Sequence, residues 1–205
     1  MADESKGADL QMNEAQDPFA LFDAWMEEAK KTEVNDPNAM SLATSTPDGV
    51  PSVRIVLLKQ VDERGFAFYT NGMSRKGVEL RENGHAALCF HWKSRQRQVR
   101  VEGTITELPS AEADAYFKRR YRMSQIGAWA SQQSRPLGSR EDLLAQTAEI
   151  EKRFPDEVPR PPYWTGFALQ PRSIEFWQEG EYRLHDRFVF TRNGEGSWTK
   201  QRLYP

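Results

Sequence analysis

The sequence contains a succession of short runs of β-branched, aromatic and aliphatic residues separated by turn signals, and this pattern constrains the fold most. Strands are expected at residues 40–44, 50–58, 66–70, 85–92, 98–108, 163–169, 173–178, 187–191 and 197–203. Helical patterns interrupt the series without alternating strictly with the strands, which disfavours a Rossmann sheet. The 13 glycines also include no G-x-G-x-x-G fingerprint. We therefore predict an α+β domain around a closed or half-closed antiparallel barrel.

Four segments carry helix signals. Helices are expected from Asp17, at residues 74–81, from Ser110 and at residues 139–154. The first begins with Asp17-Pro18, a typical start, and its apolar side chains recur at helical spacing. The last begins with a capping box formed by Ser139 and Asp142, and the Pro-rich residues 155–162 end it. These helices are expected to pack around the barrel.

The N-terminal residues 1–16 are polar and lack periodicity, so we expect a flexible tail before a single domain of residues 17–205. The first 17 residues carry five acidic residues against Lys6 alone, which argues against a secretory signal or a basic transit peptide. No apolar run reaches 18 residues, so no membrane span is expected. A cytoplasmic location is the default expectation.

Cysteine and histidine usage bears on disulfides and metals. Cys89 is the one cysteine in the sequence, which excludes an internal disulfide and a thiolate metal cluster. It lies in an apolar predicted strand, where a buried structural thiol is favoured over a nucleophile. The three histidines, His85, His91 and His185, form no H-x-x-x-H pair. We expect no metal site.

The formal net charge of −2 conceals an uneven distribution. Residues 54–135 carry 15 Lys/Arg and 8 Asp/Glu, a net charge of +7, and the rest of the chain carries −9. The middle of the chain is therefore suited to anions. Binding of nucleic acid would favour a chain that is basic overall, whereas a small phosphorylated ligand needs only a local cluster.

Two segments of this basic region could hold phosphate. Arg54 and Lys59 end an apolar run and would lie on opposite faces of a regular strand, so their burial would require anionic partners. The alternative is a barrel strand with solvated ends. Residues 69–76 end a strand and start a helix with hydroxyls, free backbone N–H groups and two cations, which suits a phosphate. The alternative there is an ordinary helix cap with surface charges.

Two further segments combine donors with aromatic rings. Tyr116, Arg120 and Ser124 recur every four residues and share one side of the third helix if it continues that far. They suggest a second anion site, and a solvated basic helix face is the alternative. Around a turn at residues 177–187, Arg183 and His185 would share a face of an extended chain with Arg187.

Several longer motifs stand in a fixed order along the chain. They are RIVLLK at residues 54–59, FYTNGMSRK at 68–76, RQVR at 97–100, SQIGAWASQQS at 124–134, EFWQ at 175–178, RLHDR at 183–187 and RLYP at 202–205. From about Asp17 to the C-terminus, the chain closely resembles the pyridoxine (pyridoxamine) 5'-phosphate oxidase family.

This resemblance implies an FMN-binding split β-barrel, Greek-key-like with peripheral helices, that forms a homodimer with FMN in clefts at the subunit interface. It implies oxidation of pyridoxine 5'-phosphate or pyridoxamine 5'-phosphate by O2 to pyridoxal 5'-phosphate in vitamin B6 biosynthesis and salvage. Hydrogen peroxide is released, with ammonia from the amine. The positions that match FMN contacts are Arg54, Ile55, Val56, Leu57, Leu58, Lys59, Tyr69, Thr70, Arg75, Lys76, Gln98, Gln133, Ser134, Trp177 and Arg187. The positions that match substrate contacts are Lys59, Tyr116, Arg120, Ser124, Arg183 and His185.

The resemblance also implies roles for two of these residues. Arg183 and His185 would be catalytic, holding the pyridine ring against the flavin and stabilising its developing charge, with His185 available as a proton acceptor. The flavin supplies the redox chemistry, while the protein orients it. Some family members carry an Arg and a Tyr in an N-terminal segment that closes over the substrate. Residues 1–17 contain neither, so another segment replaces that contact or the enzyme works without it.

Three other interpretations stay open at this point. Another flavin or deazaflavin split-barrel oxidoreductase, such as a flavin reductase, would keep the FMN positions but not the substrate positions. A non-enzymatic carrier or sensor of FMN or pyridoxal phosphate would produce no peroxide. A nucleic-acid-binding protein would show a steep salt dependence of its DNA affinity. The motifs fit the alcohol and the amine substrate equally.

Overall fold

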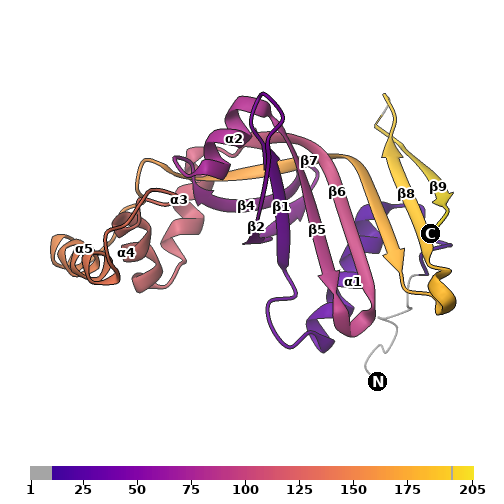
Figure 1. Cartoon of the computed structure of the whole chain (residues 1–205), viewed down its shortest axis with the longest axis horizontal. Coiled ribbons are helices and arrows are strands. Elements are labelled where there is room, and N and C mark those ends of the chain that lie inside the picture. The colour runs from indigo at the N-terminus through magenta and orange to yellow at the C-terminus, as the bar shows by residue number, and fades with distance from the viewer. Residues whose placement is uncertain (1–10, 195) are drawn as a thin grey trace, which may run out of the picture.

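A computed structural model describes residues 11–194 and 196–205 of the chain (Figure 1). Within these residues the α-helices are α1 (Pro18–Thr32), α2 (Arg75–Asn83), α3 (Ser110–Lys118), α4 (Arg122–Ala130) and α5 (Arg140–Arg153). The strands are β1 (Ala39–Ser45), β2 (Pro51–Leu57), β3 (Gln60–Asp62), β4 (Gly65–Asn71), β5 (His85–Trp92), β6 (Arg97–Glu107), β7 (Trp164–Gln178), β8 (Asp186–Arg192) and β9 (Trp198–Leu203). Two short 3-10 turns are η1 (Lys93–Arg95) and η2 (Glu181–Arg183). No helix of this part of the chain is long and apolar enough to cross a membrane.

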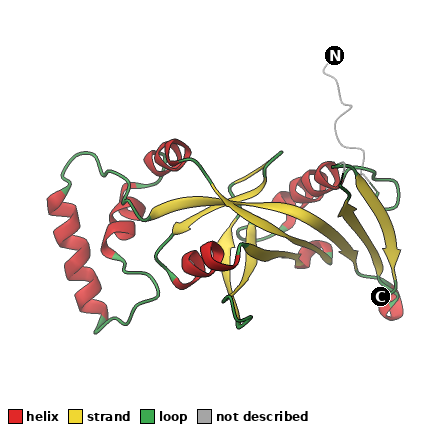
Figure 2. Cartoon of the chain, turned by 90° about the horizontal axis from the view of Figure 1, so that it is seen from above, coloured by secondary structure: helices red, strands yellow, loops and turns green. Residues whose placement is uncertain are grey.

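The strands of the described residues form one curled antiparallel sheet in the order β2-β1-β5-β6-β7-β4-β3, with β8 and β9 added beside β7. Strand β7 joins two halves of this sheet, because its first half pairs with β4 and its second half with β8. Helices α4 and α5 lie at one end of the molecule and β8 and β9 at the other (Figures 1 and 2). This architecture confirms the predicted α+β class built on a split antiparallel barrel.

Helix α1 packs against the inner face of the sheet. As predicted, Asp17 caps it, with its Oδ1 accepting the Phe19 N–H at 2.9 Å. The Phe22 ring meets the rings of Phe66 and Phe90 edge to face, with centroids 4.9 and 5.0 Å apart. Such pairs add to the apolar burial that drives folding. The core therefore lies between α1 and the sheet.

Alternation along the central strands defines two faces of the sheet. Leu88, Val101 and Ile174 are opposite one another on β5, β6 and β7 and are almost fully buried, so they mark the inner face. The residues between them along each strand point to the outer face. The register of the strands therefore shows on which face of the sheet each polar or charged residue lies.

Residues 11–16 do not form a free tail, and that part of the prediction is wrong. Met12 and Ala15 are 8% and 2% exposed and belong to the main core. The Lys200 ammonium donates to the carbonyl oxygens of Asn13 and Ala15 at 2.7 and 2.9 Å. Two apolar side chains without periodicity gave no signal of this anchoring. Residues 1–10, the rest of the predicted tail, lie outside the described residues.

The predicted break between strands 163–169 and 173–178 is also wrong, because β7 runs through Pro171 without interruption. Its register with β6 shifts between Glu102 and Gly103, which is a β-bulge. A Cβ on Gly103 would lie 1.9 Å from the Gln170 carbonyl oxygen, so only glycine fits this close approach. The bulge interrupts the hydrogen-bond ladder beside Pro171, a residue that has no N–H to donate.

The helix that begins at Ser110 ends at Lys118, earlier than the spacing suggested. A turn follows, and its Tyr121 carbonyl accepts the N–H groups of Ser124 and Gln125 at 2.8 and 3.1 Å. These bonds start α4, which the sequence patterns did not predict as a separate helix. The short strand β3 was not predicted either.

Candidate functional site

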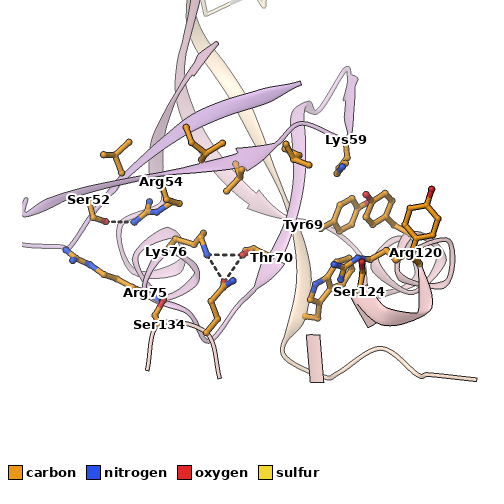
Figure 3. Close-up of a pocket in the computed structure, with 18 of the residues that line it drawn as sticks. Ser52, Arg54, Lys59, Tyr69, Thr70, Arg75, Lys76, Arg120, Ser124 and Ser134 are labelled. Carbon is orange, nitrogen blue, oxygen red and sulfur yellow. Dashed lines mark hydrogen bonds between the residues drawn. The ribbon is translucent and has the colours of Figure 1, made fainter. Parts of the chain in front are cut away.

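One cleft of about 940 Å³ collects most of the predicted site residues (Figure 3). The predicted residues that line it are Arg54, Ile55, Val56, Leu57, Lys59, Tyr69, Thr70, Arg75, Lys76, Tyr116, Arg120, Ser124, Gln133 and Ser134. Residues that line it without having been predicted are Ser52, Val53, Arg119, Tyr121 and Trp164. Leu58 is 7% exposed in the main core and does not line the cleft.

Arg54 and Lys59 do not lie on opposite faces of one strand, as the sequence suggested. Strand β2 ends at Leu57, so Lys59 lies in the link to β3, outside the strict alternation. Both side chains therefore line the same cleft, Arg54 beside α2 and Lys59 toward Tyr69 (Figure 3).

A buried cation lies at one end of the cleft. The Lys76 ammonium donates to Gln133 Oε1 at 2.7 Å, and to the hydroxyls of Thr70 and Ser74 at 3.2 Å each. All three acceptors are neutral. Burial and, to a smaller extent, the charge of neighbouring Arg54 together lower the pKa of Lys76 to about 8. A buried ammonium without an anionic partner indicates a place for a bound anion.

Elements distant in sequence complete this end of the cleft. Ser134, from the link between α4 and α5, accepts the backbone N–H of Arg75 at 3.2 Å. Arg75 is the first residue of α2, where the helix dipole favours negative charge. The helix start, Lys76 and Arg54 together form the Lys76 cluster.

Glu79 orients Arg54 and Arg75, the two arginines of this cluster. It is 3% exposed and accepts hydrogen bonds from Ser52 Oγ at 2.6 Å and from Thr44 Oγ1. It also accepts from Arg75 Nε at 2.7 Å and lies 3.5 Å from Arg54 Nη2. Burial alone raises the pKa of Glu79, but the bonds from Ser52, Thr44 and Arg75 outweigh it and hold the pKa at about 2.

Glu79→Gln should flatten the acid side of the stability profile. A carboxylate with a lowered pKa stabilises the fold above its ordinary value of 4.5 and loses this contribution as the pH falls toward 2. Between about pH 6 and pH 2, the wild-type free energy of unfolding should fall by about 2–3 kcal/mol more than that of the variant. Urea unfolding measures this, with Glu82→Gln, exposed on the same helix, as the control. Equal pH dependence in wild type and Glu79→Gln would contradict the assignment.

The other end of the cleft contains stacked aromatic rings and a second, partly buried cation. Tyr69 stacks on Tyr116 and on Trp164, with centroids 4.2 and 5.3 Å apart and planes within 7°. The Arg120 guanidinium lies 5.0 Å from the Trp164 ring centroid. Its Nη1 is buried and has no hydrogen-bond partner among the described residues. Burial lowers the pKa of Arg120, an effect that Tyr116 partly offsets.

The predicted set Tyr116, Arg120 and Ser124 comes together for a different reason than the one proposed. The three residues belong to α3, the following turn and α4, not to one continuous helix. Gln125 closes the turn by donating to the Phe117 carbonyl at 2.9 Å, and all three residues line the cleft. With Lys59, they form the Arg120 cluster.

The unpredicted lining residues differ in the signal they offered. Arg119 and Tyr121 flank a predicted residue in a basic run, so that run could have identified them. Trp164 stands alone after a Pro-rich segment, and no local pattern connects it with Arg120.

The remaining predicted residues lie elsewhere and form a second group, which we call the Trp177 cluster. Its members are Gln98, Trp177, Arg183, His185 and Arg187, and none of them lines the cleft. Trp177 is opposite Gln98 on β6 and Arg187 on β8, and the three belong to the outer face. Arg187 donates to the buried Glu175 carboxylate from Nε and Nη2, at 3.0 and 2.9 Å.

The turn at residues 181–183 departs from the extended chain on which a shared face for Arg183, His185 and Arg187 was predicted. Tyr182 and Arg183 have left-handed backbones, with φ of 56° and 65°. Side chains therefore alternate strictly between the two faces only from the start of β8. His185 precedes β8 and packs its ring on Trp177, with the ring centroids 4.6 Å apart.

The cleft and the Trp177 cluster lie at different parts of the sheet. Trp164, which lines the cleft, is the first residue of β7, whereas Trp177 is near the other end of this 15-residue strand. No residue of the Trp177 cluster lines the cleft of the same chain.

Comparisons with known proteins agree with this arrangement. Residues 26–154 match the family model described as pyridoxamine 5'-phosphate oxidase. Residues 164–205 match the model described as the pyridoxine 5'-phosphate oxidase C-terminal dimerisation region. That second segment contains Trp177, Arg183, His185 and Arg187.

Curated relatives and solved structures extend the comparison. The chain is 58% identical over 190 residues to a pyridoxine/pyridoxamine 5'-phosphate oxidase of Gluconobacter oxydans, covering 92% of this chain and 94% of the relative. It is 59% identical over 198 residues to the protein of that name in Rhodospirillum rubrum, covering 94% and 98%. The crystal structure of PhzG from Burkholderia lata, in complex with tetrahydrophenazine-1-carboxylic acid, superposes with a TM-score of 0.89 at 33% identity, covering 97% of this chain and 100% of that one. The chain belongs to the pyridoxamine 5'-phosphate oxidase family.

Proposed function

We propose that two copies of this chain hold FMN between them and oxidise pyridoxine 5'-phosphate or pyridoxamine 5'-phosphate with O2. The products are pyridoxal 5'-phosphate and hydrogen peroxide, with ammonia from the amine. The observation that carries the proposal is the Arg120 guanidinium, whose buried Nη1 has no hydrogen-bond partner among the described residues, in one cleft with the separate Lys76 cluster. Two separate cationic clusters suit two phosphorylated ligands. The names of the curated relatives support the same activity.

The residues of the Lys76 cluster fit the phosphate of FMN. Lys76 has only neutral acceptors, and it lies in the first turn of α2, where the helix dipole favours negative charge. Arg75 and Arg54 add positive charge, held by Glu79. The residues from Arg54 to Lys59 and Tyr69 would hold the rest of the cofactor along the cleft. When bound, FMN supplies the redox chemistry by taking a hydride equivalent from the substrate and passing electrons to O2.

The Arg120 cluster fits the phosphate of the substrate. Arg120 would donate from Nη1, with the hydroxyls of Tyr116 and Ser124 and the ammonium of Lys59 around the same anion. This holds one end of the substrate, so that its pyridine ring extends toward the flavin. Fixed orientation of the reacting carbon is the main contribution that the protein makes to such a transfer.

The Trp177 cluster would come from the partner subunit. Four of its five residues lie within the segment that matches the dimerisation region, and none of the five lines the cleft of the same chain. A two-fold interface repeats the same contact twice, so each cleft would meet the other subunit's cluster. Gln98, Trp177 and Arg187 would then contact FMN, and Arg183 and His185 the pyridine ring.

An anaerobic visible spectrum tests the proposed activity. The purified protein should be yellow, and pyridoxine 5'-phosphate without O2 should bleach its flavin band. Admission of O2 should restore the band and yield about one peroxide per substrate oxidised. A carrier or sensor would stay yellow and give no peroxide. Bleaching by a reduced nicotinamide alone would instead favour a flavin reductase.

The likeness to PhzG offers one competing substrate class. The ligand in that structure, tetrahydrophenazine-1-carboxylic acid, is a carboxylic acid without a phosphate group. The Arg120 cluster favours a phosphate ester, because three donors and the Lys59 ammonium line the same cleft and would surround one anion. Anaerobic bleaching by tetrahydrophenazine-1-carboxylic acid, but not by pyridoxine 5'-phosphate, would reverse this assignment.

The binding of FMN should weaken as the pH rises above about 8. In the free protein Lys76 loses its proton there, whereas a bound phosphate favours the charged ammonium, so binding takes up a proton at higher pH. The affinity of the apoprotein should fall up to ~10-fold per pH unit. Fluorescence titration measures this, with riboflavin, which lacks the phosphate, as the control ligand. Lys76→Arg should remove the pH dependence, and its persistence in that variant would contradict the role of Lys76.

Two broader proposals accompany the activity. Residues 17–205 would act as a single oxidase domain, with residues 11–16 packed on its core. The cytoplasm would be its location, which suits a chain whose one cysteine, Cys89, is free.

A further inference from the structure

The His185 ring is held from two sides. It packs on the Trp177 indole with centroids 4.6 Å apart and planes at 45°. The backbone N–H of Gly180 donates to its Nδ1 at 3.2 Å. The ring is therefore fixed in position and in rotation, although it stands on a connection between two strands.

The bond from Gly180 also determines where the ring proton resides. A ring nitrogen that accepts an N–H must be unprotonated, and a neutral imidazole carries one proton. Nδ1 is the acceptor here, so Nε2 carries the proton. Nε2 has no hydrogen-bond partner within residues 11–194 and 196–205. It presents a free N–H donor on the side of the ring that faces away from Gly180.

The backbone of the turn keeps the Gly180 amide in place. Leu184 N–H donates to the Glu181 carbonyl at 3.0 Å, and the left-handed Tyr182 and Arg183 bend the chain back on itself. A Cβ on Gly180 would lie 2.2 Å from the Leu184 carbonyl oxygen. Only glycine fits this approach, so the contact between residues 180 and 185 depends on it.

We propose that the Gly180 amide selects the Nε2–H tautomer of His185, so that His185 acts as a hydrogen-bond donor to the substrate and not as a base. Gly180 is then a positioning residue. The inference rests on the proposed function for the identity of the ligand, and it deepens that function by giving the imidazole one role. An electron-rich oxygen on the pyridine ring is the acceptor that fits, because Arg183 on the same turn is also a donor.

The tautomer can be observed directly in FMN-loaded protein labelled with ¹⁵N-histidine. The chain has three histidines, and the signals lost in His185→Gln identify His185. Long-range ¹H–¹⁵N correlations should show the proton on Nε2. Gly180→Ala should abolish this preference, whereas Gly194→Ala, where an added Cβ meets nothing within 4 Å, should leave it intact. An Nδ1–H tautomer in the wild type, or an unchanged tautomer in Gly180→Ala, would overturn the proposal.

Two replacements of His185 separate a donor from a base. Glutamine keeps an N–H donor near the position of Nε2, while glutamate supplies only acceptors at neutral pH. His185→Gln should keep anaerobic flavin reduction within ~10-fold of wild type, and His185→Glu should lose ~100-fold or more. A smaller loss of flavin reduction in His185→Glu than in His185→Gln would show that His185 is a base. Failure of the proposed function is distinguishable, because the wild type itself would then not be reduced, while its tautomer could still be measured.

Discussion

Arg120→Ala should raise the KM for pyridoxine 5'-phosphate by ~100-fold and leave the bound FMN in place. The guanidinium lies over Trp164, and its Nη1 is buried without a hydrogen-bond partner among the described residues, so a phosphate is the partner that its surroundings lack. Truncating one partner of a buried charged pair removes about 2–5 kcal/mol of binding. Steady-state kinetics with the phosphorylated substrate and with unphosphorylated pyridoxine measure the effect, because only the former should weaken.

The matched control for this variant is Lys118→Ala, on the same helix. Lys118 is exposed, pairs with Glu157 and does not line the cleft. Its removal should leave the KM unchanged. The free Arg120→Ala protein should also be as stable as wild type or more so, since an unpaired buried cation destabilises the fold. An unchanged KM in Arg120→Ala would contradict the assignment of the substrate phosphate.

Arg183→Ala should keep FMN but reduce it ~100-fold more slowly with substrate, a loss typical of one removed donor in a preorganised site. Arg183 has a left-handed backbone and lies in a turn that contributes no residue to the hydrophobic core. We therefore attribute this conformation to the positioning of a functional side chain and not to the stability of the fold. Anaerobic stopped-flow bleaching measures the rate.

Two further variants separate the side chain of Arg183 from its backbone. Arg183→Gly removes the guanidinium and relieves the positive φ, so it should be as slow as Arg183→Ala. Arg192→Ala, at the far end of β8, should bleach at the wild-type rate. Unchanged bleaching in Arg183→Ala would refute the role of this residue.

The local patterns in the sequence predicted most elements correctly, because capping and periodicity act over a few residues. Asp17 and Ser139 cap their helices as the sequence indicated. The failures needed information from elsewhere in the chain. Pro171 in β7 lies beside a bulge in which Arg172 has no partner on β6 between Glu102 and Gly103, and the anchoring of residues 11–16 depends on Lys200.

The predictions for the site succeeded and failed for the same reasons. The motifs identified the residues of the cleft, but the expected face of Lys59 and the single helix for Tyr116, Arg120 and Ser124 were wrong. Both errors extended an ideal strand or helix past its end. Trp164 and Glu79 were missed because each acts on a cleft arginine through a tertiary contact: Trp164 stacks with Arg120, and Glu79 pairs with Arg54.

The central claim is that each active site is shared by two chains, and complementation in mixed dimers tests it most directly. Arg120→Ala disables the cleft and Arg183→Ala disables the Trp177 cluster, so each homodimer should be nearly inactive. When the two chains are co-expressed, a mixed dimer contains one site with both clusters intact. At a substrate concentration that saturates the wild type but lies well below the raised KM of Arg120→Ala, random mixing should then restore roughly a quarter of the wild-type activity. Mixed dimers no more active than the two homodimers would contradict a shared site.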